Sequence, residues 1–135
     1  CKSCKFDSNS CSKKGGAIYL DFDSDPTLID AVFSNNYALE SGGCIAEDGK
    51  SFTTFNGSTT FTSNYAVMEG GCLYSGSGVG ISIEQGFSFE EPPTFTNNYM
   101  FHSDVGQSDM YGWPYSVFKI AGVPAKEATS EPSTS

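Results

Sequence analysis

The side chains of this sequence that are best suited to chemistry are carboxylates and thiols. Three alternating aspartates, Asp21, Asp23 and Asp25, have the spacing at which a calcium-binding loop begins, because alternate carboxylates can converge on one cation. Pro26, however, stands where such a loop needs glycine, and Val32 stands in place of its final glutamate. We therefore interpret the cluster as a solvated acidic turn, with a calcium site as the alternative.

The five cysteines indicate an oxidising compartment, and their odd number leaves one thiol over or pairs it outside this chain. Cys1, Cys4 and Cys11 contain half of a zinc motif, but no second Cys pair follows and the sole histidine is distant. A disulfide within this group is therefore the preferred interpretation, and no metal is expected.

Charge and residue usage exclude several classes of protein. The formal net charge is −9 and every basic residue is a lysine, so phosphate neutralisation is poorly served and a nucleic-acid partner is excluded. No apolar run approaches the ~20 residues of a membrane helix. The consecutive residues His102, Ser103 and Asp104 cannot converge as a triad, because neighbouring strand residues face opposite sides. We expect no catalysis and no cofactor.

The elements that position these side chains are set by an internal repeat. Four segments begin with phenylalanine and place asparagine three residues later, at starts 27, 28 and 34 residues apart. The pairs are Phe6/Asn9, Phe33/Asn36, Phe61/Asn64 and Phe95/Asn98. In the first three units a glycine pair follows nine residues after the phenylalanine, at Gly15-Gly16, Gly42-Gly43 and Gly70-Gly71. Two signatures with one period predict a repeat architecture.

A unit of this length holds about three short strands and three bends, which favours a right-handed parallel β-helix of about four coils. Identical positions then stack about 4.8 Å apart. We expect the phenylalanines to fill the interior, the asparagines to occupy a bend with αL geometry and bonded amides, and the glycines to mark a second bend. The β-helix domain is predicted to span residues 1–123 and a disordered Ser/Thr/Pro tail residues 124–135.

Two further columns of the repeat leave alternatives open. Tyr37, Tyr65 and Tyr99 share one position and form either an exposed aromatic binding strip or part of the core. Cys44 and Cys72 also share a position, so they are either a disulfide between coils or a ladder of interior thiols.

The combination of FxxN with GGA[I/L/V] resembles the repeat of the chlamydial polymorphic membrane proteins, which implies a parallel β-helix carried by a surface adhesin. The fourth unit departs from this pattern, because Asp104-Val105 replaces the glycine pair. The segment from Gly106 to Pro114 is similar to the end of repeat arrays in large surface proteins of ciliates and other protists. We therefore predict a cap over about residues 106–123, in which Trp113, Tyr115 and Phe118 cover the core.

These features predict a secreted, non-catalytic structural or adhesive module of a larger cell-surface protein. Asn56-Gly57-Ser58 is an acceptor motif for an N-linked glycan on a predicted turn. The expected partners are a protein or glycan at a cell surface, or copies of the chain itself. Two alternatives remain: a subunit of an extracellular filament made by end-to-end stacking, and a polysaccharide-active β-helix enzyme.

Overall fold

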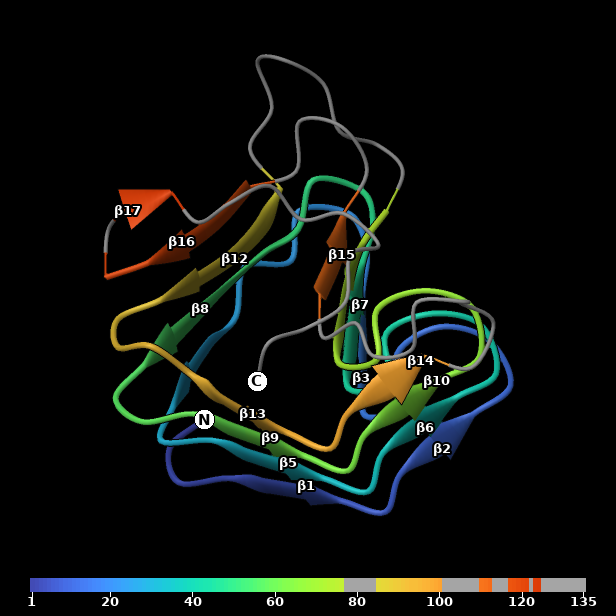
Figure 1. The fold of residues 1–135 in the computed structure, drawn as a ribbon. Coiled ribbons are helices and arrows are strands. Elements are labelled where there is room, and N and C mark those ends of the chain that lie inside the picture. Colours follow the sequence, from blue (N-terminus) through green and yellow to red (C-terminus); the bar gives the residue numbers. More distant parts are fainter. Residues whose placement is uncertain (77–84, 101–109, 113–116, 122, 125–135) are drawn as a thin grey trace.

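The computed structural model describes residues 1–76, 85–100, 110–112, 117–121 and 123–124. All regular structure among these residues is β-strand, and the strands form stacked sheets that the chain visits in turn as it winds (Figure 1). Every strand pair is parallel except the last, between β16 and β17. The predicted all-β, parallel β-solenoid is therefore confirmed.

Each sheet collects the same strand from successive windings, and the fourth sheet also contains a final antiparallel strand. The phenylalanine sheet consists of β1 (Lys5–Asp7), β5 (Val32–Ser34), β9 (Thr60–Thr62) and β13 (Thr94–Thr96). The tyrosine sheet consists of β2 (Ser10–Cys11), β6 (Tyr37–Ala38), β10 (Tyr65–Ala66) and β14 (Tyr99–Met100). The third sheet consists of β3 (Ile18–Leu20), β7 (Ile45–Glu47), β11 (Leu73–Ser75) and β15 (Met110–Gly112). The fourth sheet consists of β4 (Thr27–Ile29), β8 (Phe52–Asn56), β12 (Gly86–Phe89), β16 (Val117–Ile120) and β17 (Val123–Pro124).

The interior is built mainly from stacked phenylalanine rings. Along the phenylalanine sheet, Phe6, Phe33, Phe61 and Phe95 are in register, with neighbouring ring centroids 4.7, 5.1 and 4.9 Å apart. Phe33 and Phe61 are fully buried, whereas the two end members are partly buried. Phe55 from the facing fourth sheet packs edge-on against both buried rings. Each buried ring contributes roughly 1.5–3 kcal/mol by leaving water, and the aromatic geometry adds to that.

The two glycines of each pair serve different purposes. Gly42, the first of its pair, has a φ of 68°, a left-handed conformation that glycine adopts without strain. Gly43, the second, has no space for a side chain, because a Cβ there would collide with the carbonyl oxygen of Gly71 and the backbone of Tyr65. Close packing of windings at this bend therefore requires the repeated pair.

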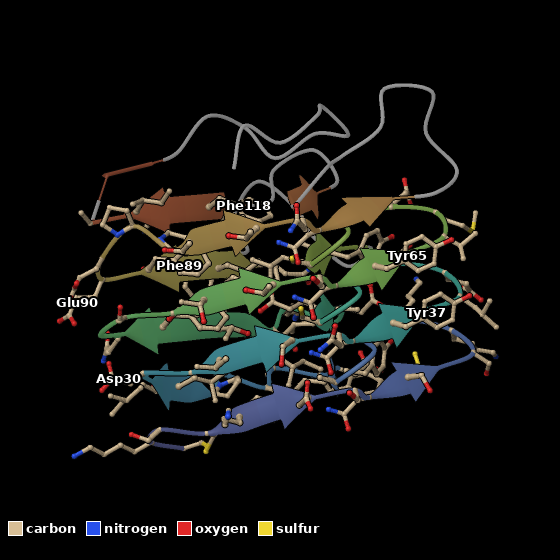
Figure 2. The ribbon with its side chains drawn as sticks, turned by 60° about the horizontal axis from the view of Figure 1, so that its bottom comes forward. Asp30, Tyr37, Tyr65, Phe89, Glu90 and Phe118 are labelled. Atoms are coloured by element: carbon tan, nitrogen blue, oxygen red, sulfur yellow. A yellow bond between two sulfur atoms is a disulfide. The ribbon has the colours of Figure 1, made fainter. Side chains whose placement is uncertain are left out.

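The C-terminal strands extend the windings instead of simply covering them. β15 pairs in parallel with β11, and β16 pairs in parallel with β12. The buried Phe118 lies 5.4 Å from Phe87 between ring centroids, and Figure 2 shows it above Phe89 near the end of the stack. β17 folds back antiparallel on β16 and pairs Pro124 with Lys119, across the predicted domain boundary.

The predicted cap and tail are covered only in part. Trp113 and Tyr115 of the proposed cap, and residues 125–135 of the tail, lie outside the described residues. The cap over residues 106–123 and the domain boundary at residue 123 therefore stay predictions.

The N-terminal residues are tied to the fourth sheet. Lys2 forms a parallel bridge with Ile29, the last residue of β4, and the Ser3 amide donates to the Ile29 carbonyl at 2.7 Å. A disulfide joins Cys1 to Cys4 across this segment. The edge of β4 is therefore occupied by the chain's own first residues.

Candidate functional site

The asparagine ladder, Asn9, Asn36, Asn64 and Asn98, holds the bend between the phenylalanine and tyrosine sheets. The Nδ2 of each of the first three donates to the Oδ1 of the next at 2.9–3.0 Å. The same Oδ1 accepts the backbone amide of the preceding asparagine, and the Nδ2 of Asn64 also reaches the carbonyl of Phe33. The buried amide of Asn64 therefore uses all of its donors and acceptors.

The expected αL geometry of these asparagines is wrong by one residue. The left-handed φ values fall on the residue before each asparagine, between 56° and 60°, at Ser8, Asn35, Ser63 and Asn97. The reason is that the turn at that residue swings the following amide into the interior, where the ladder can form. Short polar residues tolerate this conformation, which matches the residue types found.

The tyrosine face is the partly exposed column of Tyr37 and Tyr65 on the outside of the tyrosine sheet. In each strand the residue after the tyrosine faces the opposite side of the sheet, and these residues, Ala38 and Ala66, are fully buried. The two rings are stacked, with centroids 4.9 Å apart and planes 9° from parallel, and both are partly exposed. Figure 2 shows them one above the other on the same side of the stack. Tyr99 continues the column in register with Tyr65.

An apolar side chain extends the tyrosine face. Leu39 lies two residues beyond Tyr37, and its amide donates to the Cys11 carbonyl, so it continues the strand direction. Leu39 is 46% exposed. With the two tyrosines it forms a mixed aromatic and aliphatic surface with phenolic hydroxyls, which is the composition expected of a contact surface.

The cysteines divide between the N-terminus and the interior. Among the first three, the disulfide joins Cys1 to Cys4, and Cys11 in β2 is a partly buried thiol. Cys44 and Cys72 are buried thiols in adjacent windings, with the Cys44 amide donating to the Cys72 carbonyl at 2.9 Å. Of the two alternatives for this pair, the structure contains the interior thiols.

The aspartates of the candidate calcium site are used to hold turns. Asp21 accepts a hydrogen bond from the Phe22 amide, and Asp25 accepts one from the amide of Phe52 in the next winding. Asp23 is exposed and has a φ of 59°. Within the described part of the chain, no three His, Cys, Asp or Glu side chains are grouped as a metal site would require.

The glycan acceptor Asn56 ends strand β8 instead of lying within a turn, and it is partly buried. The turn begins at Gly57, whose amide donates to Glu90 at 2.8 Å, and the next amide donates to Asp30 at 2.9 Å. Figure 2 shows these two carboxylates on the same side of the stack, Glu90 above Asp30. Glycosylation of Asn56 stays a prediction.

A buried polar cluster in the interior was not predicted from the sequence. We call it the Glu47 cluster: Glu47, Thr53, Ser75 and Gln85, all fully buried where the third and fourth sheets meet. The Thr53 hydroxyl donates to Oε2 of Glu47, whereas Oε1 of Glu47 is buried without a hydrogen-bond partner. Burial raises the pKa of Glu47 to about 9, and the charges of Asp25 and Asp48 act in the same direction.

No sequence signal could have indicated this cluster. The column of Glu47 reads Leu20, Glu47 and Ser75 in register, so its members share neither size nor polarity. Gln85 enters from a longer unit, and its Nε2 donates to Ser75 at 3.0 Å. The residues of the rejected triad, among them His102, lie outside the described residues.

Comparison with known proteins supports the repeat. The sequence profile of the Chlamydia polymorphic membrane protein repeat matches residues 3–21, which include Phe6, Asn9 and the first glycine pair, and this confirms the resemblance. No curated protein matches the chain. No solved structure matches it either. In the described part of the chain, no helix has the length and apolar character needed to cross a membrane.

Proposed function

We propose that this β-solenoid is a non-catalytic adhesive and structural module of a cell-surface protein, and that its tyrosine face binds a partner protein. The observation that carries the proposal is the partly exposed stack of Tyr37 and Tyr65, with the exposed Leu39 two residues beyond Tyr37. The match to a repeat of polymorphic membrane proteins supports a surface location, and the Cys1–Cys4 disulfide is consistent with an oxidising compartment.

The geometry of the stack favours a protein over a sugar on this face. Because the rings of Tyr37 and Tyr65 cover each other, they present edges and hydroxyls outward, not open ring faces. Edges and hydroxyls suit apolar contacts with additional hydrogen bonds, as in protein interfaces. The net charge of −9 favours a partner that carries basic residues near the contact.

The test measures adhesion of beads coated with the purified chain to cultured epithelial cells. The double variant Tyr37→Ser/Tyr65→Ser should lose most of the adhesion, while Phe22→Ser, which changes an apolar side chain that is 84% exposed elsewhere, should keep it. Protease treatment of the cells should abolish adhesion and raised salt should weaken it. Equal adhesion by both variants would reject the tyrosine face as the binding surface.

A second candidate is end-to-end assembly. The strands β1, β2 and β3 each lie at the end of their sheets, and an edge strand is a template for another chain. A second copy stacked head to tail would continue the asparagine ladder, because each asparagine donates to the next in one direction only. Electron microscopy at neutral pH distinguishes the candidates: long unbranched fibres support assembly, and isolated short rods contradict it.

A further inference from the structure

A second surface site lies at the bend between the tyrosine sheet and the third sheet. An open pocket there is lined by Lys13, Lys14, Tyr19 and Glu40. The lysines precede β3, which contains Tyr19, and Glu40 follows β6 in the next winding. The Glu40 amide donates to the Lys13 carbonyl at 2.8 Å, so the two walls of the pocket are joined through the backbone.

Tyr19 offers what the tyrosine face lacks, an aromatic ring whose face is not covered by another ring from the next winding. Its in-register neighbour in that winding is Ala46, and the side chain is 49% exposed. The Tyr19 hydroxyl donates to Oδ2 of the buried Asp48 at 2.8 Å, which fixes the ring before any ligand binds. Burial, and then the hydrogen bond to Asp48, raise the pKa of Tyr19 to about 12, so the phenol stays a donor at physiological pH.

Charges of both signs surround the pocket. Lys14 Nζ lies 3.7 Å from Oδ2 of Asp48 and 5.1 Å from the ring centroid of Tyr74, so this ammonium is held by an ion pair and an aromatic ring. Lys13, which is exposed, and Glu40, which is partly buried, supply one further charge of each sign. The ammonium groups are offset by the carboxylates of Asp48 and Glu40, and the charge of Asp21 also acts on Tyr19, so the site does not attract an anion. Its donors and acceptors instead match the paired hydroxyls of a neutral sugar.

We propose that this pocket binds a neutral pyranose, with the apolar C–H face of the sugar on the ring of Tyr19 and its hydroxyls bonded to the Lys13 ammonium and the Glu40 carboxylate. An acidic sugar is disfavoured, because the carboxylates of the site and the net charge of −9 oppose it. The site is separate from the tyrosine face and does not depend on the function proposed for that face.

The test uses saturation-transfer NMR and titration of the full chain with methyl glycosides of glucose, galactose, mannose and N-acetylglucosamine. Sialic acid serves as the acidic comparison. At least one neutral glycoside should bind with a Kd on the order of 1 mM, as expected for a shallow site. Sialic acid should bind at least tenfold more weakly than the best neutral sugar.

Variants locate the site. Tyr19→Ala should weaken binding at least tenfold, whereas Tyr19→Phe, which keeps the ring and loses the bond to Asp48, should weaken it about threefold. Glu40→Gln should weaken it several-fold, and Thr94→Ala, at an exposed position of β13, should leave it unchanged. Unchanged amide spectra away from the pocket establish that each variant is folded. The proposal is overturned if no neutral glycoside binds at 50 mM, if sialic acid binds best, or if folded Tyr19→Ala and Tyr19→Phe both bind as the unchanged chain does.

Discussion

Two buried polar regions at different bends of the solenoid show how repetition solves a problem that a single residue cannot. In the asparagine ladder, the side-chain amide of Asn64 donates to Asn98 and to the Phe33 carbonyl and accepts two hydrogen bonds from Asn36. In the Glu47 cluster, Oε1 of Glu47 is buried without a partner. In the first region the buried polar groups repeat and are hydrogen-bonded. In the second the residues do not repeat and a buried carboxyl oxygen has no hydrogen-bond partner.

The difference follows from stacking identical side chains. An amide carries donors on one atom and acceptors on the other, so an asparagine directly above another presents a donor to an acceptor at every step. A carboxylate has acceptors alone, and its register neighbours Leu20 and Ser75 do not repeat it. A buried group without a repeated partner must keep its proton, which is why the pKa of Glu47 rises to about 9.

The largest expected effect comes from a substitution in the stacked phenylalanine column, which repeats as regularly as the asparagine ladder. Phe61→Ala should lower the free energy of unfolding by about 3–5 kcal/mol, because the ring is fully buried between Phe33 and Phe95. Chemical denaturation followed by circular dichroism measures it. A loss under about 0.5 kcal/mol, typical of surface sites, would contradict the interior position of this column.

Removing one member of the asparagine ladder should cost somewhat less. Asn64→Ala leaves the Asn36 backbone amide without its acceptor and removes one of the two hydrogen bonds made by Asn36 Nδ2. Asn98 Oδ1 keeps the backbone amide of residue 64 but loses the side-chain donor, and buried unsatisfied groups cost about 1–3 kcal/mol each. We expect a loss of about 2–4 kcal/mol in the same denaturation experiment. An unchanged midpoint would mean that the ladder does not stabilise the bend.

In the Glu47 cluster, by contrast, a substitution should raise the free energy of unfolding at high pH. The folded-state pKa of Glu47, about 9, lies above its ordinary value of 4.5, so the folded chain binds the proton more tightly than the unfolded chain. Its contribution to stability is therefore complete below pH 4.5 and is lost as the pH rises towards 9, at up to about 1.4 kcal/mol per pH unit.

Glu47→Gln removes this titration. We expect the variant to match the unchanged chain near pH 5 and to exceed its stability by about 1–3 kcal/mol near pH 8. Denaturation at both pH values measures the difference, in which the slopes of all other groups cancel. A variant that is destabilised equally at both values would show that Glu47 is charged and paired in the folded chain.

The smallest effect is expected at the exposed end of the ladder. Asn9 is exposed and donates to Asn36 without being covered by another winding, so Asn9→Ala should cost less than about 1 kcal/mol. Asn9→Ala and Asn64→Ala remove the same side chain, one exposed and one buried. The difference between their losses of stability therefore measures how much burial of the amide contributes. Equal losses for the two variants would remove that distinction.

The repeat columns could be predicted because each recurs at a constant offset, and residues at a constant offset in a winding chain lie over one another. The register of Phe33 with Phe61 and of Tyr37 with Tyr65 follows from that rule. Whether the tyrosines face outward did not follow, since alternation assigns two sides without saying which is the interior. The sequence did not place the left-handed conformation on the residue before each asparagine. Both positions recur with the same period, so the repeat does not show which of the two has a positive φ.

Period and residue type, read from the sequence alone, determined the parallel β-solenoid and the columns that stack within it. Only the tertiary structure decided which polar groups are enclosed together, such as Glu47 with Gln85, and which single side chains form the pocket at Tyr19. The physical reason is that stacking repeats the same contact in every winding, so one period predicts all of them. A contact between different residues of different windings occurs once and depends on the exact path of the chain.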